Sequence, residues 1–172
     1  MLIGIGFSLI SLIAIAWQDF ASRSVYWWWF IVLFVGAITF TISKHPDGFN
    51  WTNILVNVCL VLLVSAGAAL YYFIRYTGSA FGKLKNSIGL GDFAMLPTLV
   101  LVFSPVNFLL FFIATIVISI LGSVITVALT KKITNIPLAG YWAVSLLFCV
   151  IGSSFDIINL YNDSWIYLWF QI

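Results

Sequence analysis

Six apolar runs, joined by polar connections, fill most of this 172-residue chain. A helix that crosses a bilayer needs about 20 mostly apolar residues, or fewer where neighbouring helices or local thinning help. We therefore predict membrane-spanning helices at residues 2–18, 26–43, 52–74, 91–103, 106–130 and 137–155. The expected fold class is an all-α, polytopic membrane protein with about six transmembrane helices, and residues 1–172 form one domain. Residues 156–172 are rich in aromatic side chains and are expected to form a C-terminal tail at the membrane interface.

Charged residues are too few to cover a soluble protein. They make up 7% of the chain, against about 25% in soluble domains, so the lipid bilayer is the expected surrounding. The longest basic run is Lys131-Lys132, which argues against a nucleic-acid partner. Cys59 and Cys149 lie in apolar runs and have no CxxC spacing. We expect no metal site and no cofactor.

The cations are distributed unevenly among the connections, and this predicts the orientation. If the connection after the first run is cytoplasmic, six of the seven cations lie inside, as the positive-inside rule requires. These six are Arg23, Arg75, Lys83, Lys85, Lys131 and Lys132, and only Lys44 lies outside. Both termini then face outward in a multi-pass protein of the cell's inner membrane. The first run lacks a basic start and a cleavage site, so we expect it to be retained as a span.

Two aspartates lie at the ends of predicted spans. Asp19 follows the first run and Asp92 opens the fourth, and the two intervening crossings return the chain to the same side. Ionisable groups within a membrane are costly and usually functional. Two neighbouring carboxylates share one proton, so one can take a proton from water while the other donates to a peptide carbonyl. The pair is therefore a candidate for aspartyl proteolysis.

The residues around each aspartate suggest separate roles for the two carboxylates. Gly89 and Gly91 permit unusual backbone shapes and close approach by another chain. A helix N-terminus favours ionised Asp92, and a helix C-terminus favours protonated Asp19, so we assign Asp92 as the base and Asp19 as the acid. The simpler alternative is that Asp19 pairs with Arg23 one turn later and that Asp92 only caps its helix.

Three motifs, in chain order, resemble the type IV prepilin peptidase family of GxGD-type intramembrane aspartyl proteases. They are the span ending in Asp19 with Arg23 and Val25, the run Gly89-Leu90-Gly91-Asp92-Phe93, and Lys131-Lys132 followed by Ile136-Pro137-Leu138-Ala139-Gly140. The likeness covers essentially the whole chain and matches the family's core peptidase portion. It implies an aspartic endopeptidase that cuts leader peptides from prepilins or pseudopilins on the cytoplasmic side.

The resemblance also implies roles for individual residues. Asp19 and Asp92 match the catalytic positions, and Gly89, Gly91 and Phe93 form the supporting motif. The chain departs from the family at Ala94, where a lysine is common, and at Tyr26-Trp27, where Pro-Asn is common. The cysteine-containing methyltransferase domain of many members has no counterpart, so we expect no methylation activity.

Other interpretations stay open at this stage. The GLGDF run also resembles the presenilin and signal-peptide-peptidase branch, although Gln18 precedes Asp19 and Pro137-Leu138-Ala139 has a different order from that branch's Pro-Ala-Leu. The aspartates could instead relay protons in a small transporter, or the chain could be a non-enzymatic scaffold. Pro137 either keeps the last helix start unwound as an edge for an extended substrate, or simply begins that helix.

Overall fold

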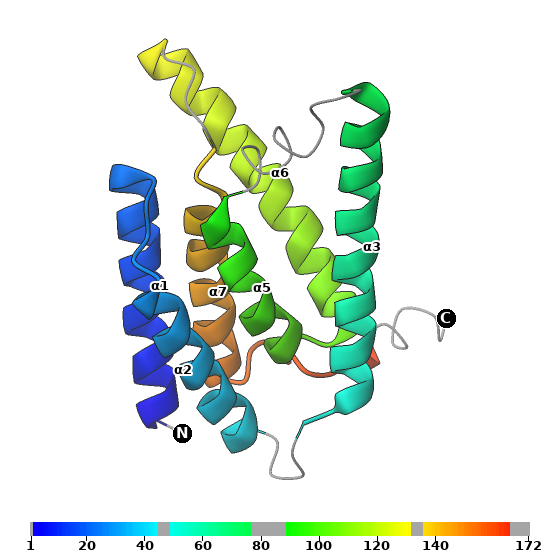
Figure 1. Cartoon of the computed structure of the whole chain (residues 1–172). Coiled ribbons are helices and arrows are strands. Elements are labelled where there is room, and N and C mark those ends of the chain that lie inside the picture. The colour runs from blue at the N-terminus through cyan, green and yellow to red at the C-terminus, as the bar shows by residue number, and fades with distance from the viewer. Residues whose placement is uncertain (1, 45–48, 77–88, 132–135, 166–172) are drawn as a thin grey trace.

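The computed structural model describes residues 2–44, 49–76, 89–131 and 136–165, and the regular structure within these ranges is helical throughout (Figure 1). The helices are α1 (Leu2–Ser22), α2 (Trp28–Lys44), α3 (Trp51–Arg75), α5 (Leu90–Val102), α6 (Pro105–Thr130) and α7 (Leu138–Ser154). Each of the six predicted apolar runs corresponds to one of these helices, with bounds that differ by a few residues. The all-α fold class is confirmed.

Three of the helices are long and apolar enough to cross a membrane. They are Gly4–Ser22 in α1, Trp51–Arg75 in α3 and Pro105–Leu129 in α6, while α2, α5 and α7 are shorter apolar helices. The exposure of α3 is the reverse of that in a water-soluble helix, because Asn57 is its only buried residue while Leu63 and Phe73 are more than 70% exposed. A soluble helix buries its apolar side chains and exposes its polar ones. The reversed pattern of α3 fits a helix whose outer faces are covered by lipid.

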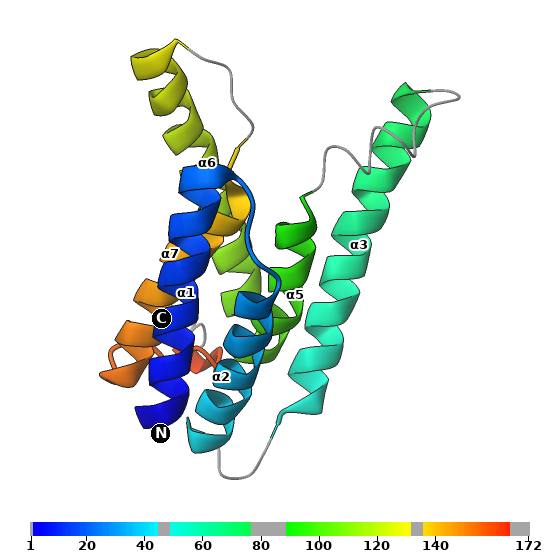
Figure 2. The same ribbon diagram turned by 60° about the vertical axis from the view of Figure 1, so that its left-hand side comes forward.

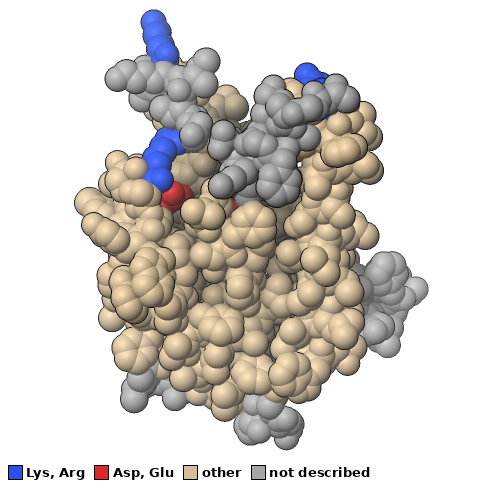
Figure 3. Space-filling view, viewed as in Figure 1, with Lys and Arg blue, Asp and Glu red and all other residues tan. Residues whose placement is uncertain are grey.

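The helices alternate in direction, so that the ends of α1, α3 and α6 and the starts of α2, α5 and α7 are directed toward the same end of the bundle (Figures 1 and 2). Arg23, Arg75 and Lys131 lie at this end of the bundle, which we call the basic end (Figure 3). Lys44 lies at the opposite end, the Lys44 end, where it pairs with Asp156 at 2.5 Å. The charge asymmetry predicted from the sequence is therefore present among the described cations, and Lys83, Lys85 and Lys132 lie outside the described residues.

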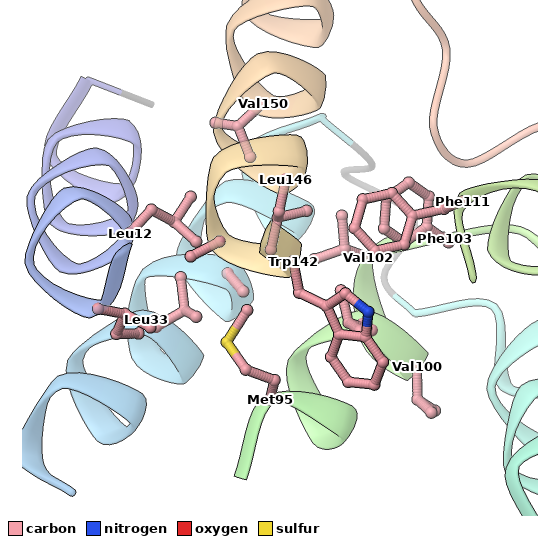
Figure 4. Close-up of a cluster of buried hydrophobic side chains, with 14 of the residues drawn as sticks. Leu12, Leu33, Met95, Val100, Val102, Phe103, Phe111, Trp142, Leu146 and Val150 are labelled. Atoms are coloured by element: carbon pink, nitrogen blue, oxygen red, sulfur yellow. The ribbon is translucent and has the colours of Figure 1, made fainter. Parts of the chain in front are cut away.

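The core lies between α1, α2, α5 and α7, with α3 and α6 along one side (Figures 1 and 4). Leu12, Leu33, Met95 and Leu146 meet there, each at most 1% exposed. Close approach of α1 and α2 depends on Gly36, where an added Cβ would lie 2.7 Å from the Ser8 hydroxyl and 2.9 Å from its amide nitrogen. Small residues at helix contacts are a common solution in membranes, where packing rather than water drives association.

Asn57 joins α3 to the end of α5. Its side-chain Nδ2 donates to the carbonyl oxygens of Val100, at 3.1 Å, and Phe103, at 2.7 Å. The last carbonyls of a helix have no partner within that helix. The one buried residue of α3 therefore satisfies the C-terminal end of the short helix that carries Asp92.

Residues 156–165 cross the Lys44 end and are fastened to the corner between α5 and α6. The Asp163 carboxylate accepts hydrogen bonds from the Ser104 hydroxyl (2.6 Å) and from the amides of Val106 (3.2 Å) and Asn107 (3.3 Å). The Leu160 carbonyl accepts from the Ser104 amide at 2.8 Å, and the Leu160 side chain is buried. This half of the predicted interfacial tail packs on the bundle and caps α6, and residues 166–172 lie outside the described residues.

Replacing Asn57 with Ala should destabilise the fold by about 1–2 kcal/mol, because two buried carbonyls of α5 lose their donor. The measurement is unfolding in a mixed-micelle denaturant titration, followed by circular dichroism. Cys59→Ala is the matched control, because Cys59 is exposed on the same helix. Equal stability of the two variants would contradict the capping role of Asn57.

Candidate active site

Asp19 lies within the last turn of α1, not beyond the end of the helix, because α1 continues to Ser22. The residue is 9% exposed, so its carboxylate points into the bundle and not outward to lipid. Its Oδ2 atom accepts a hydrogen bond from the backbone N–H of Gly140, at 2.6 Å. The first and last helices of the chain therefore meet at this carboxylate.

Asp92 is the third residue of α5 and lies close to the residue that caps that helix. Gly89 is the cap, with an extended backbone (ψ 138°), and an added Cβ there would lie 3.1 Å from Asp92 Oδ2. The backbone amides of Gly89 and Ala139 donate to the Asp92 carboxylate. A carboxylate that reaches back to the cap of its own helix satisfies a free amide there, as in a capping box. Gly89 leaves the room that this arrangement needs, which explains the first glycine of the motif.

The structure brings Asp19 and Asp92 into one recess at the basic end. The two carboxylates interact electrostatically, and both line a cavity of about 970 Å³ between α1, α5, α6 and α7. Arg23, Ser119 and Pro137 also line it, and Arg23 interacts electrostatically with Asp19. In Figure 3, acidic atoms show at this end, below the basic side chains. The recess is therefore a polar site at the ends of apolar helices.

The start of α7 supplies amides to both aspartates. Pro137 precedes the helix (φ −78°, ψ 71°) and has no N–H, and the Leu138 amide donates to the Ile136 carbonyl at 2.9 Å. The Tyr141 amide makes the first bond within the turn, to the Pro137 carbonyl at 3.2 Å. The amides of Ala139 and Gly140 lie between these two and face Asp92 and Asp19. Pro137 is therefore the N-cap residue of α7, and its carbonyl accepts the first hydrogen bond of the helix. The helical residues Leu138 and Ala139 line the recess beside it, so the helix begins at the recess wall.

Phe93 lies on another side of the motif, in an apolar groove of about 240 Å³ between α3, α5, α6 and α7. Asp92 is at the edge of this groove as well as in the polar recess. Gly91 packs loosely, because an added Cβ would lie 3.5 Å from Ala139 and from Phe30, which is ordinary contact. Each predicted residue of the motif therefore lies at or beside the recess.

Sequence reasoning did not single out Ala139 and Gly140 as site residues. A signal for them was present, because the last apolar run begins at Pro137, directly after Ile136, and neither side chain has an oxygen that could cap a helix. A helix start without a cap of its own needs acceptors from elsewhere in the fold. The only uncommitted acidic groups at that end of the predicted topology were Asp19 and Asp92.

The arrangement is suited to proton transfer and to activation of water. Two interacting carboxylates in a polar recess can alternate as base and acid. Amide donors stabilise the ionised form of a carboxylate, and both aspartates have them, so this contact does not single out Asp19 as the proton donor. Within the described residues, no three of His, Cys, Asp and Glu gather into a metal-binding group.

No protein family, curated protein or solved structure matches this chain. What the chain does must therefore be argued from its own residues. The relevant facts are the shared recess of Asp19 and Asp92, the amides around them, and the apolar groove beside Asp92.

Cysteines introduced at Asp19 and Asp92 should be linked by a short bifunctional thiol reagent, because both positions line the same recess. The test uses a Cys59→Ala, Cys149→Ala background and detects the link by mass spectrometry. The matched control pair joins Asp19→Cys with Ser43→Cys, since Ser43 lies beside Lys44 at the opposite end. Linking of both pairs, or of neither, would contradict a shared recess.

Proposed function

We propose that this chain is a membrane-embedded aspartic endopeptidase, similar to the prepilin peptidases, that cuts leader peptides from prepilin-like or pseudopilin-like proteins at the cytoplasmic face. The observation that supports the proposal most strongly is the meeting of Asp19 and Asp92 in one recess. These are the two aspartates that the sequence motifs predict to be catalytic. Gly89 and Gly91 lie around the second carboxylate, as a supporting motif should.

In the proposed reaction the carboxylates share one proton. The ionised carboxylate takes a proton from water, and the resulting oxygen attacks the peptide carbonyl while the protonated carboxyl group donates to the carbonyl oxygen. The C–N bond then breaks, and the departing nitrogen receives a proton from the pair. The substrate must be extended at the cut, because a helical carbonyl is already hydrogen-bonded to its own backbone.

The surroundings of Asp92 support a cut at the boundary between a polar and an apolar segment. Asp92 lies where the polar recess meets the apolar groove that contains Phe93, Leu96 and Trp142. Arg23 lines the recess, so a basic leader meets like charge there. In this proposal the apolar segment of the substrate, more than the charge of its leader, determines recognition.

The proposed placement has all six helices in the membrane and the basic end in the cytoplasm. The shorter helices α2, α5 and α7 have 17, 13 and 17 residues, and local thinning of the bilayer lets such helices cross. Arg23, Arg75 and Lys131 then lie inside, as the positive-inside rule favours. The start of α1 and residues 156–165 lie together at the Lys44 end, which is the outer face in this orientation.

Asp19→Asn and Asp92→Asn should each lower the cleavage rate by about 10²- to 10⁴-fold, the usual contribution of acid–base groups. Asparagine is chosen because its side-chain oxygen still accepts the amide hydrogen bonds at the start of α7. The assay co-expresses the chain with prepilin-like proteins from its own genome and measures loss of the leader by mass spectrometry. Asp156→Asn is the matched control, because Asp156 is exposed and pairs with Lys44 at the opposite end.

The same assay separates the alternative functions. Full cleavage by the Asp92→Asn variant would rule out the proposed pair. Cleavage inside the apolar helix, not ahead of it, would assign the chain to a presenilin-like activity. A wild-type chain that cleaves none of the candidates, yet carries protons across liposomes in an aspartate-dependent way, would be a transporter, and one that does neither would be a scaffold.

Orientation can be tested with Ser24→Cys and Ser43→Cys in the cysteine-free background. Ser24 lines the recess and Ser43 lies at the Lys44 end. A membrane-impermeant thiol reagent should label Ser24→Cys only from the cytoplasmic side and Ser43→Cys only from the outer side. The reverse labelling pattern would place the recess outside the cell and overturn the proposed localisation.

A further inference from the structure

Gly140 is close to Asp19 in a way that no role proposed so far explains. Its N–H donates to Asp19 Oδ2 at 2.6 Å, which is short for a hydrogen bond from a backbone amide. We propose that Gly140 is a positioning residue, whose amide and missing side chain together fix the place of the Asp19 carboxylate. The catalytic consequence rests on the proposed peptidase activity, whereas the positioning itself can be tested without that activity.

The absence of a side chain at position 140 matters because the surrounding space is full. An added Cβ would lie 3.1 Å from Asp19 Oδ2, 3.3 Å from Asp19 Cβ and 3.3 Å from Cε2 of Phe20. All three contacts are tighter than ordinary packing, and they come from the same turn of α1. A methyl group at this position therefore requires its neighbours to move by a few tenths of an ångström, and the nearest of them is the Asp19 carboxylate oxygen.

The amide of the preceding residue, Ala139, explains why the start of α7 positions both carboxylates and not that of Asp19 alone. Successive residues of a helix are displaced around its axis by about 100°. The free amides of Ala139 and Gly140 point out of the N-terminal end of α7 from different positions around its axis, so they can reach two neighbouring acceptors. Asp92 accepts from Ala139, and Asp19 accepts from Gly140. One helix start thus sets the relative position of two carboxylates that belong to α5 and α1.

The start of α7 is itself held firmly, as a positioning element must be. The Tyr141 ring packs edge-to-face on Phe20, with ring centroids 5.1 Å apart. On its other side, Tyr141 lies directly against Gly122 of α6, which has no side chain to block it. Trp142 and Ala143 follow and are buried in the core. The amides at positions 139 and 140 therefore have a fixed frame of reference in the bundle.

The first experiment compares Gly140→Ala with Gly67→Ala in the cleavage assay. Gly140→Ala should lower kcat by about 10- to 100-fold, the effect of a small misplacement of a reacting group, while KM and the unfolding midpoint stay near wild type. Gly67→Ala is the matched control, because an added Cβ on Gly67 meets no atom within 4 Å. Wild-type kcat in Gly140→Ala would overturn the positioning role.

The second experiment reads the Asp19 carboxylate directly and needs no substrate. Infrared spectra of protein with isotope-labelled aspartate isolate the Asp19 band as the difference between Asp92→Asn and the double variant Asp19→Asn, Asp92→Asn. Adding Gly140→Ala to Asp92→Asn should shift this band, and adding Gly67→Ala should not. An unshifted band overturns the proposal, because a glycine needed only for packing would leave the carboxylate unchanged. A shifted band in a protein that cleaves no candidate substrate supports the positioning role of Gly140 and contradicts the proposed peptidase function.

Discussion

The hydrogen bond between the Gly140 amide and the Asp19 carboxylate joins residues 121 positions apart and holds the first helix against the last. The first amides of a helix have no partner within that helix, so an amide buried at a helix start must find its acceptor elsewhere in the protein. Asp19 meets this need for Gly140, and Asp92 meets it for Ala139. The carboxylates that accept hydrogen bonds from the first amides of α7 are thus the same groups that can exchange protons. In this fold the completion of a helix start and a chemical capability use the same atoms.

The same constraint operates at the other helix ends of the bundle. The C-terminal carbonyls of α5 receive hydrogen bonds from Asn57, and the first amides of α6 donate to Asp163. In both cases the partner comes from a distant segment. Ser104 makes no side-chain cap to α6, as Pro137 makes none to α7, so the starts of both helices depend on carboxylates elsewhere in the chain. The bundle therefore derives much of its order from a few polar side chains at helix ends, while its apolar surfaces are shared between core and lipid.

The extent of each helix was predictable because it depends on local composition. The lengths of the apolar runs predict all six helices, and the number of crossings between Asp19 and Asp92 predicts that they lie at one end. The end of α1 differs because the predicted span stops at Gln18, where the apolar run ends, whereas the helical backbone continues to Ser22. The partners of the helix ends could not be predicted, since Asp163 and Gly140 acquire their roles only through contacts distant in sequence. The assignment of separate acid and base roles from two helix ends also omitted α7, which contacts both carboxylates.

The capping of α6 by Asp163 has a consequence for biogenesis. Val106 leaves the ribosome 57 residues before the carboxylate that accepts its amide hydrogen bond. Until residues 160–163 have been synthesised, the corner between α5 and α6 must satisfy its polar groups with other partners, such as water. The arrival of these residues replaces the temporary partners, so a segment near the end of the chain completes a corner that was made long before it. The order of translation therefore makes closure of this corner a late event, after α7 has been synthesised.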